Sequence, residues 1–163
     1  MRVRSLFEPD PKAARFRWVG TEAETRTMTT LDAVMPVIRS FRAHPSSLYQ
    51  VRQFIRQQAE NASLNGEITD DLLLAVSEAC VNAVLHSSSR TVKVSWRHAG
   101  GCAEVVVQDE GVFQRRLPMP EIEGPSGRGI LLMMAVMDEV TIREGNPREP
   151  GTQVRLRKCQ SEI

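Results

Sequence analysis

The sequence predicts an α+β fold, a two-layer sandwich in which helices cover one face of a mixed, mostly antiparallel sheet. Three observations support this prediction. Two segments with apolar residues at helical spacing precede two segments in which apolar and polar residues alternate. A third apolar helix follows a loop rich in Pro and Gly, and two further alternating segments flank a Gly-containing turn. The 163 residues suffice for one domain with a proper core.

The first half of this fold is predicted to hold an edge strand and two helices. Residues 37–41 read as the strand, and residues 46–62 as a helix with a Ser cap at its start. Asn65-Gly66 interrupts the chain. The second helix is expected to start at Thr69, with acidic residues in its first turn where the helix dipole favours them, and to end near Ser87.

The second half is predicted to hold four strands and one helix. Residues 92–96 and 103–107 alternate as strands around the turn at Gly100-Gly101. The remaining segments are a loop at 112–126, a helix from Gly127 to about Met137, and a hairpin of residues 140–142 and 154–156 across 145–151.

Composition narrows the class of protein. Hydrophobic content of 41% and charged content of 25% are ordinary for a soluble globular chain. No run of 18 apolar residues and no apolar signal core is visible, so we expect a cytoplasmic protein without a membrane partner. The net charge of +1 gives no overall attraction to nucleic acid.

Charge and periodicity separate the N-terminal residues from the rest. Residues 1–56 hold ten Arg and Lys against five Asp and Glu, whereas residues 57–163 hold eleven against fifteen. An excess of basic residues near the N-terminus would attract an acidic partner surface, or it could belong to a solvated leader segment. Residues 1–36 show no clean periodicity, so we expect a poorly defined extension there and the folded domain in residues 37–160.

The three cysteines are Cys80, Cys102 and Cys159. Their number is odd, and they are widely spaced without metal-ligand spacing. Because Cys80 and Cys102 lie in apolar runs, both are expected to be small core residues.

The most informative segment is the second helix, where Glu78, Asn82 and His86 recur every four residues. This spacing places the three on one stripe of a helix. A carboxylate and an amide inside an apolar helix cost several kcal/mol, to order of magnitude, unless they are satisfied, and a bound metal and phosphate would satisfy them. A solvated helix face or a capped turn is the structural alternative, and His86 fits a pocket-rim or structural residue.

Three further motifs follow in order, and each has a plain structural alternative. Asp109-Glu110-Gly111 ends a strand and would also make an ordinary β-turn. Gly127-Arg128-Gly129 opens a helix, so its N–H groups could face phosphates, or it could be a flexible junction. Gly151-Thr152 begins the last strand, which a lone Thr could do without any ligand.

The four motifs together resemble the four boxes of the GHKL ATPase superfamily, which binds ATP in a Bergerat fold. The resemblance covers roughly residues 40–158. It implies that Asn82 binds Mg²⁺ through its carbonyl oxygen, jointly with the phosphates of ATP. Glu78 would act as general base on the attacking hydroxyl. Asp109 would accept the adenine amino group.

The remaining motif residues also receive roles from this resemblance. Gly111 would let the backbone approach the base, and Thr152 would help to fix adenine, often through water. Gly127, Arg128 and Gly129 would face the phosphates, below a lid formed by residues 112–126. Phe113 stands where many relatives have a second Gly, a departure that bears on lid flexibility and nucleotide retention rather than on the adenine contact.

The sequences of two motifs, at residues 77–84 and 127–140, resemble those of the bacterial anti-sigma-factor serine kinases. This resemblance implies a homodimer that binds a sigma factor and phosphorylates Ser or Thr of an anti-sigma-factor antagonist of the STAS type. The His-bearing helix of sensor kinases and the transducer domain of topoisomerases are not recognisable. A regulatory module that binds nucleotide without phosphate transfer remains the alternative, favoured by Phe113 and disfavoured by Glu78. A third interpretation, an α+β domain that binds no ligand, would require the four motifs to occur in this order by chance.

Overall fold

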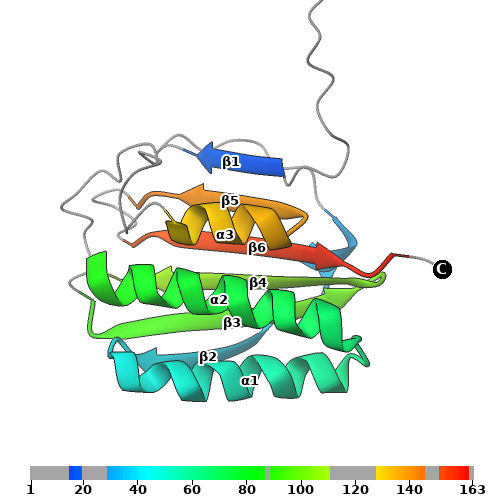
Figure 1. The fold of residues 1–163 in the computed structure, drawn as a ribbon, viewed down its shortest axis with the longest axis horizontal. Helices are drawn as coiled ribbons and strands as arrows, with labels where there is room; N and C mark the ends of the chain where they lie inside the picture. The colour runs from blue at the N-terminus through cyan, green and yellow to red at the C-terminus, as the bar shows by residue number, and fades with distance from the viewer. Residues whose placement is uncertain (1–14, 20–28, 87–88, 111–127, 146–150, 162–163) are drawn as a thin grey trace, which may run out of the picture.

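The computed structural model describes residues 15–19, 29–86, 89–110, 128–145 and 151–161, with the backbone alone for Trp18, Val19 and His86. Within these ranges the chain forms one six-stranded sheet with helices on one face (Figure 1). In chain order the elements are β1 (Arg15–Val19), η1 (Thr30–Ala33), β2 (Val37–Arg42), η2 (Pro45–Ser47), α1 (Leu48–Asn61), α2 (Gly66–His86), β3 (Thr91–Ala99), β4 (Cys102–Asp109), α3 (Arg128–Val136), β5 (Glu139–Arg143) and β6 (Gln153–Cys159).

The strand order across the sheet is β1-β5-β6-β4-β3-β2. Every neighbouring pair is antiparallel except β1 with β5, which is parallel. Figure 1 shows α1, α2 and α3 side by side in one layer in front of the sheet. The predicted α+β sandwich with a mixed, mostly antiparallel sheet is therefore confirmed.

The core lies between this helical layer and the sheet. Side chains alternate along each strand, so that Val92, Val94 and Trp96 of β3 face the helices and are buried. The helices bury the complementary residues at helical spacing, among them Val51, Phe54, Ile55 and Ala59 of α1 and Leu72, Ala75, Val76, Ala79 and Ala83 of α2. Among the helices of the described ranges, none combines the length and apolar character needed to cross a membrane.

Both predicted helix starts need correction. α1 begins at Leu48 after the short η2 turn, and Ser47 makes no capping hydrogen bond through its side chain; the His44 ring accepts the Ser46 N–H instead. α2 begins at Gly66, one turn before the predicted Thr69 cap, because the side chain of Asn65 accepts the N–H of Ile68. A short amide side chain suits this capping position as well as Thr does.

The N-terminal residues contribute more than the sequence indicated. β1 adds a parallel strand to the sheet edge, although no element was expected before residue 37. η1 packs against the open face of the sheet, and its Leu31 is 1% exposed. Thr29 and Asp32 form a capping box at its start. Five- and four-residue elements lack the length for a periodicity that could be recognised in sequence.

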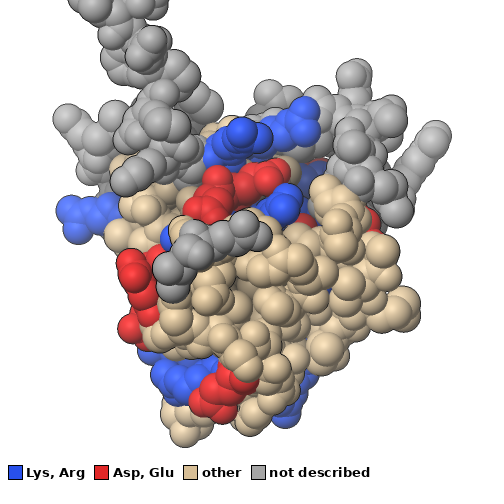
Figure 2. Space-filling model, turned by 90° about the vertical axis from the view of Figure 1, so that its right-hand side faces the viewer, with Lys and Arg blue, Asp and Glu red and all other residues tan. Residues whose placement is uncertain are grey.

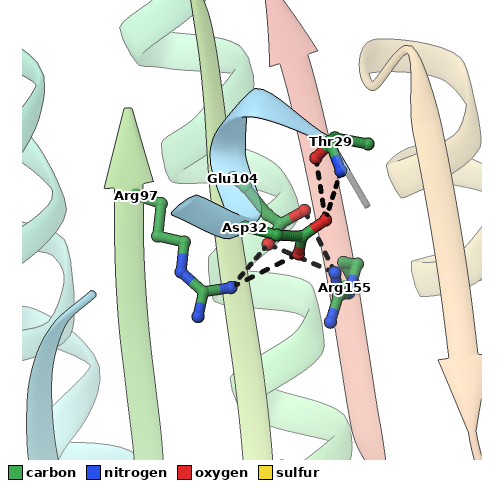
Figure 3. Close-up of polar contacts among 5 residues, drawn as sticks. All are labelled: Thr29, Asp32, Arg97, Glu104 and Arg155. Atoms are coloured by element: carbon green, nitrogen blue, oxygen red, sulfur yellow. Dashed lines mark hydrogen bonds and ion pairs between the residues drawn. The ribbon is translucent and has the colours of Figure 1, made fainter. Parts of the chain in front are cut away.

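Charged residues tie η1 to the open face (Figure 3). Glu104 of β4 is only 2% exposed, and both of its carboxylate oxygens accept from Arg155 Nη1 at 3.3 Å. Arg97 Nη1 lies 3.5 Å from Glu104 and 3.9 Å from Asp32 of η1. The two guanidinium groups offset the desolvation of the buried carboxylate, and Asp32 extends the cluster to the N-terminal residues.

Cys102 is not the core thiol expected from the sequence. It stands directly opposite Cys159 in the β4–β6 ladder, and the two form a disulfide with a Cα–Cα distance of 4.0 Å. Cys80 is free and buried, as predicted. Cys102 and Cys159 are 57 residues apart in sequence, so their pairing could be seen only once β4 and β6 were known to be neighbours.

Candidate functional site

The predicted stripe on α2 is partly exposed at Glu78 and Asn82, the two of its residues whose side chains are described. Glu78 and Asn82 follow one another by one turn, and neither is fully buried. His86 is the last residue of α2, and its side chain lies outside the described atoms. The stripe is therefore accessible to a ligand rather than sealed in the core.

The first turn of α3 packs against this stripe. A Cβ atom placed on Gly129 would lie 2.9 Å from Glu78 Oε2 and 3.5 Å from Asn82 Nδ2. A side chain at position 129 would therefore displace the end of the Glu78 side chain from its present place. Arg128 precedes Gly129 and is exposed. The first N–H groups of α3, which have no partner within their own helix, thus lie beside the Glu78 and Asn82 side chains, and helix starts of this kind suit anions.

Asp109 and Thr152 meet at the ends of β4 and β6. Asp109 is 2% exposed, and its Oδ1 accepts the Thr152 N–H at 3.1 Å. The Asp109 N–H donates in turn to the Thr152 carbonyl at 3.2 Å. Gly151 has φ +109°, and a Cβ there would overlap the Asp109 carbonyl oxygen. Glycine is therefore required at 151 for both conformation and space.

A cavity brings these two groups of residues together. Its volume is about 20 Å³, and its walls are Ala79, Asn82, Ala83, Val107, Asp109, Ile142, Thr152 and Val154. Asn82 from α2, Asp109 from β4 and Thr152 from β6 supply the polar atoms, and the rest of the lining is apolar. The volume is enough for about one water molecule, so a purine base requires the walls to move apart.

Thr152 Oγ1 is buried and has no hydrogen-bond partner among the described residues. A buried hydroxyl without a partner costs about 1–3 kcal/mol, which a bound water or ligand would recover. Its position beside the Asp109 carboxylate gives the cavity a donor and acceptors against apolar walls. Such a lining fits the flat, partly polar edge of a nucleobase.

The described residues contain no group of three His, Cys, Asp or Glu side chains that could hold a metal by themselves. Asn82 offers a single hard oxygen. That donor fits Mg²⁺, which is commonly held by one or two protein oxygens together with substrate phosphates and water. A cation at this position would therefore arrive with its nucleotide.

Most predicted site residues converge at one end of the molecule, where α2 and β4 end and α3 and β6 begin (Figure 1). Gly111, Gly127, Phe113 and the predicted lid at 112–126 lie outside the described residues. Ala79 and Ala83 also form walls of the cavity, although no sequence motif marked them as site residues. Their spacing of four places both on one face of α2, but only the packing of the chain shows that this face meets Asp109.

A larger groove of about 230 Å³ lies at the opposite end. It is lined by residues before and at the start of β2, around the end of α1 and in β3: Val34, Met35, Val37, Gln58, Asn61, Ala62, Trp96, Arg97 and His98. Figure 2 views the molecule from this end, where most visible side chains are uncharged and the charged ones gather toward the margins. The groove contains none of the predicted site residues.

The fold and the site together define a class of protein, an α+β sandwich of the GHKL type with its motifs gathered at one end of the sheet. The family model of the histidine kinase-like ATPase domain matches residues 41–158. The match covers well over half of the chain, so this chain belongs to the histidine kinase-like ATPase family. Membership supports an ATP-binding domain with activity of the kinase or ATPase type.

Two known proteins show how far the similarity extends. The sensor protein NarQ homolog of Haemophilus influenzae is 29% identical over 125 residues, which cover 76% of this chain and 21% of that protein. The chain thus spans about a fifth of that relative's length. The crystal structure of the RsbU and RsbW domains of Rv1364c from Mycobacterium tuberculosis has a TM-score of 0.61 and 21% identity, covering 80% of this chain and 34% of that one. This second likeness establishes the fold.

Proposed function

We propose that this protein binds Mg-ATP and transfers the γ-phosphate to Ser or Thr of a protein partner, as an anti-sigma-factor-type kinase. The observation that supports this most is the meeting of Asp109 and Thr152 with Asn82 in one cavity, beside Glu78 and Gly129. The cavity would take the base, and the first turn of α3, beside Glu78 and Asn82, would take the phosphates. The match to an RsbW-containing structure supports this branch of the family by fold.

Three groups would hold the nucleotide. Asp109, fixed through one oxygen by the Thr152 N–H, would accept the adenine amino group, and Thr152 Oγ1 would donate or accept beside it. Ala79, Ala83 and Val107 would contact the faces of the ring. Asn82 would give its oxygen to Mg²⁺, and the first N–H groups of α3 would contact phosphate oxygens.

Glu78 would serve the transfer itself. It lies one turn from Asn82, is partly exposed, and has its Oε2 directed at the start of α3. A partner hydroxyl would give its proton to this carboxylate while its oxygen bonds the γ-phosphorus, and the bond to ADP would break. A module that only held nucleotide would gain nothing chemically from a carboxylate here.

The expected partners are a sigma factor and a STAS-type antagonist carrying the acceptor Ser or Thr, and the expected assembly is a homodimer. β2 supports an assembly of copies because it is an edge strand with Val37 and Ile38 47% and 54% exposed. The basic residues of the N-terminal third suit an acidic partner surface.

Phosphate transfer is the decisive test. The protein is incubated with radiolabelled Mg-ATP and candidate antagonist proteins, and label on the antagonist is counted. We expect transfer by the natural protein, and a decrease of about 10²–10⁴-fold in Glu78→Gln with ATP affinity unchanged. Glu67→Gln, at an exposed position on the same helix, is the matched control and should transfer normally.

Binding of ATP without transfer to any antagonist would favour the non-catalytic regulatory module. Equal transfer by Glu78→Gln and the natural protein would remove Glu78 from the role of base.

A further inference from the structure

The disulfide and the candidate site lie at opposite ends of one strand pair. β4 runs from Cys102 to Asp109, and β6 returns from Gln153, next to Thr152, to Cys159. The Cys102–Cys159 bond closes this pair at one end, and the reciprocal Asp109–Thr152 hydrogen bonds close it at the other. The 57-residue separation of the cysteines contains the Asp109, Gly129 and Thr152 motifs.

The end of β6 also holds the far end of α3. Lys158 Nζ donates to the Val136 carbonyl at 2.6 Å and pairs with Asp71 of α2 at 3.0 Å. The Cys159 N–H donates to Asp138 Oδ2 at 2.7 Å. The other end of the same helix presents Gly129 to Glu78 and Asn82. A loosened β6 terminus would therefore loosen the helix that forms one side of the site.

Both disulfide sulfurs belong to partly exposed residues, and a cation lies beside one of them. Arg157 Nη2 is 3.7 Å from Cys102 Sγ. A guanidinium group favours the thiolate, which is both the leaving group on reduction and the nucleophile on oxidation. Cys80 does not compete, because it is buried and burial raises the pKa of its thiol to about 12.

We propose that Cys102 and Cys159 form a reversible thiol–disulfide switch whose oxidised form binds nucleotide more tightly. The proposal rests on the ATP binding proposed above. The oxidant is a small-molecule disulfide of the glutathione class. One protein thiolate attacks it and releases one glutathione thiolate; the second protein thiolate attacks the mixed disulfide and releases the other. Two electrons pass from the protein dithiol, two protons leave it, and two glutathione thiols result.

The coupling has a defined size and direction. We expect the dithiol form to bind Mg-ATP about fivefold more weakly than the disulfide form, at the lower end of usual coupling between sites. Linkage then requires Mg-ATP to shift the thiol–disulfide equilibrium by the same factor toward the disulfide, which is about 20 mV for two electrons. Without the disulfide, the end of β6 keeps noncovalent contacts: those of Lys158 and the hydrogen bonds of Cys159 and Gln160, whose N–H donates to Gly101 at 2.8 Å.

The test is a redox titration of the whole chain. Protein is equilibrated at graded ratios of reduced to oxidised glutathione, with and without Mg-ATP, then denatured and alkylated. Mass spectrometry counts one reactive thiol in the oxidised form and three in the reduced form. We expect a midpoint within the glutathione range, displaced toward the disulfide by Mg-ATP. Calorimetry of both forms should give the fivefold difference in ATP affinity.

Two variants complete the experiment. The double variant Cys102→Ser with Cys159→Ser should bind ATP with the affinity of the reduced natural protein at every glutathione ratio. Cys80→Ala should show the same change of ATP affinity with glutathione ratio as the natural protein. Where the double variant does not fold, the reduced natural protein provides the comparison. A disulfide that stays closed at every ratio, or equal ATP affinity of both forms, would overturn the switch. Binding of ATP by neither form would instead overturn the proposed function.

Discussion

Asp109 has a structural role in the sheet and a proposed role in binding adenine. One carboxylate oxygen is committed to the Thr152 N–H, and the side chain is 2% exposed. A buried carboxylate is retained only when hydrogen bonds offset its desolvation. Gly151, the residue before Thr152, packs against the backbone carbonyl of Asp109, so any Cβ at position 151 would overlap this oxygen. The β-turn alternative for this motif includes Gly111, which lies outside the described residues.

Replacement of Asp109 by Asn separates the two roles. The amide keeps an oxygen for the Thr152 N–H, so folding should be retained, but its NH₂ group is a poor neighbour for an adenine amino donor. We expect ATP affinity, measured by calorimetry, to fall at least about tenfold, which corresponds to about 1.4 kcal/mol. Asp70→Asn, an exposed position on α2, should change nothing. Unchanged affinity in Asp109→Asn would place adenine elsewhere.

At the scale of elements, the contact between α2 and α3 sets the geometry around Glu78 and Asn82 in the candidate site. The two helices run in opposite directions, because Gly129 at the start of α3 meets Glu78 and Asn82, while Val136 at its end lies by Lys158 and Asp71. Gly129 is helical and needs no unusual φ. Its requirement is one of space, and the atom in the way is the end of a flexible Glu side chain.

Gly129→Ala is therefore expected to fold normally and react poorly. Ala favours a helix over Gly by about 1 kcal/mol, which compensates for displacing Glu78 Oε2. Thermal unfolding should stay within a few degrees of the natural protein, whereas phosphate transfer should fall about tenfold through the displaced carboxylate. Gly66→Ala is the control, since a Cβ there meets nothing within 4 Å. Full transfer by Gly129→Ala would show that the position of Glu78 is unimportant.

The second organising feature at this scale is the open face of the sheet. Strand register aligns Arg15, Glu139, Arg157, Glu104 and Arg97 in one row across five strands. Neighbouring charges in this row alternate in sign, so each strand attracts the next. Asp32 of η1 joins the row at Arg97. Arg15 of the basic N-terminal part thus stands opposite Glu139 in the sheet, whereas the acidic Asp32 pairs with Arg97 of a later strand.

For the whole molecule, the N-terminal residues are part of the folded unit where they are described. β1 extends the sheet beyond β5, and Leu31 is buried on the open face. We expect Leu31→Ala to lower the free energy of unfolding in urea by about 2–3 kcal/mol, because it removes a fully buried side chain. Met35→Ala, 86% exposed, should change it by less than about 0.5 kcal/mol. A loss for Leu31→Ala as small as that of the control would mean that η1 does not stabilise the sheet.

The sequence by itself determined the α+β class, the identity of the central strands and the order of the four motifs. These follow from local periodicity and from residue types such as Glu78, Asn82 and Asp109, which carry their chemistry wherever the chain places them. Only the tertiary structure decided that Gly129 lies against Glu78 and that Thr152 shares a cavity with Asn82. It also decided that Cys102 meets Cys159, that β1 joins the sheet and that η1 packs on it. Each of these depends on which distant segments become neighbours. That choice is made by packing and strand register across the whole chain, and a local pattern does not contain it.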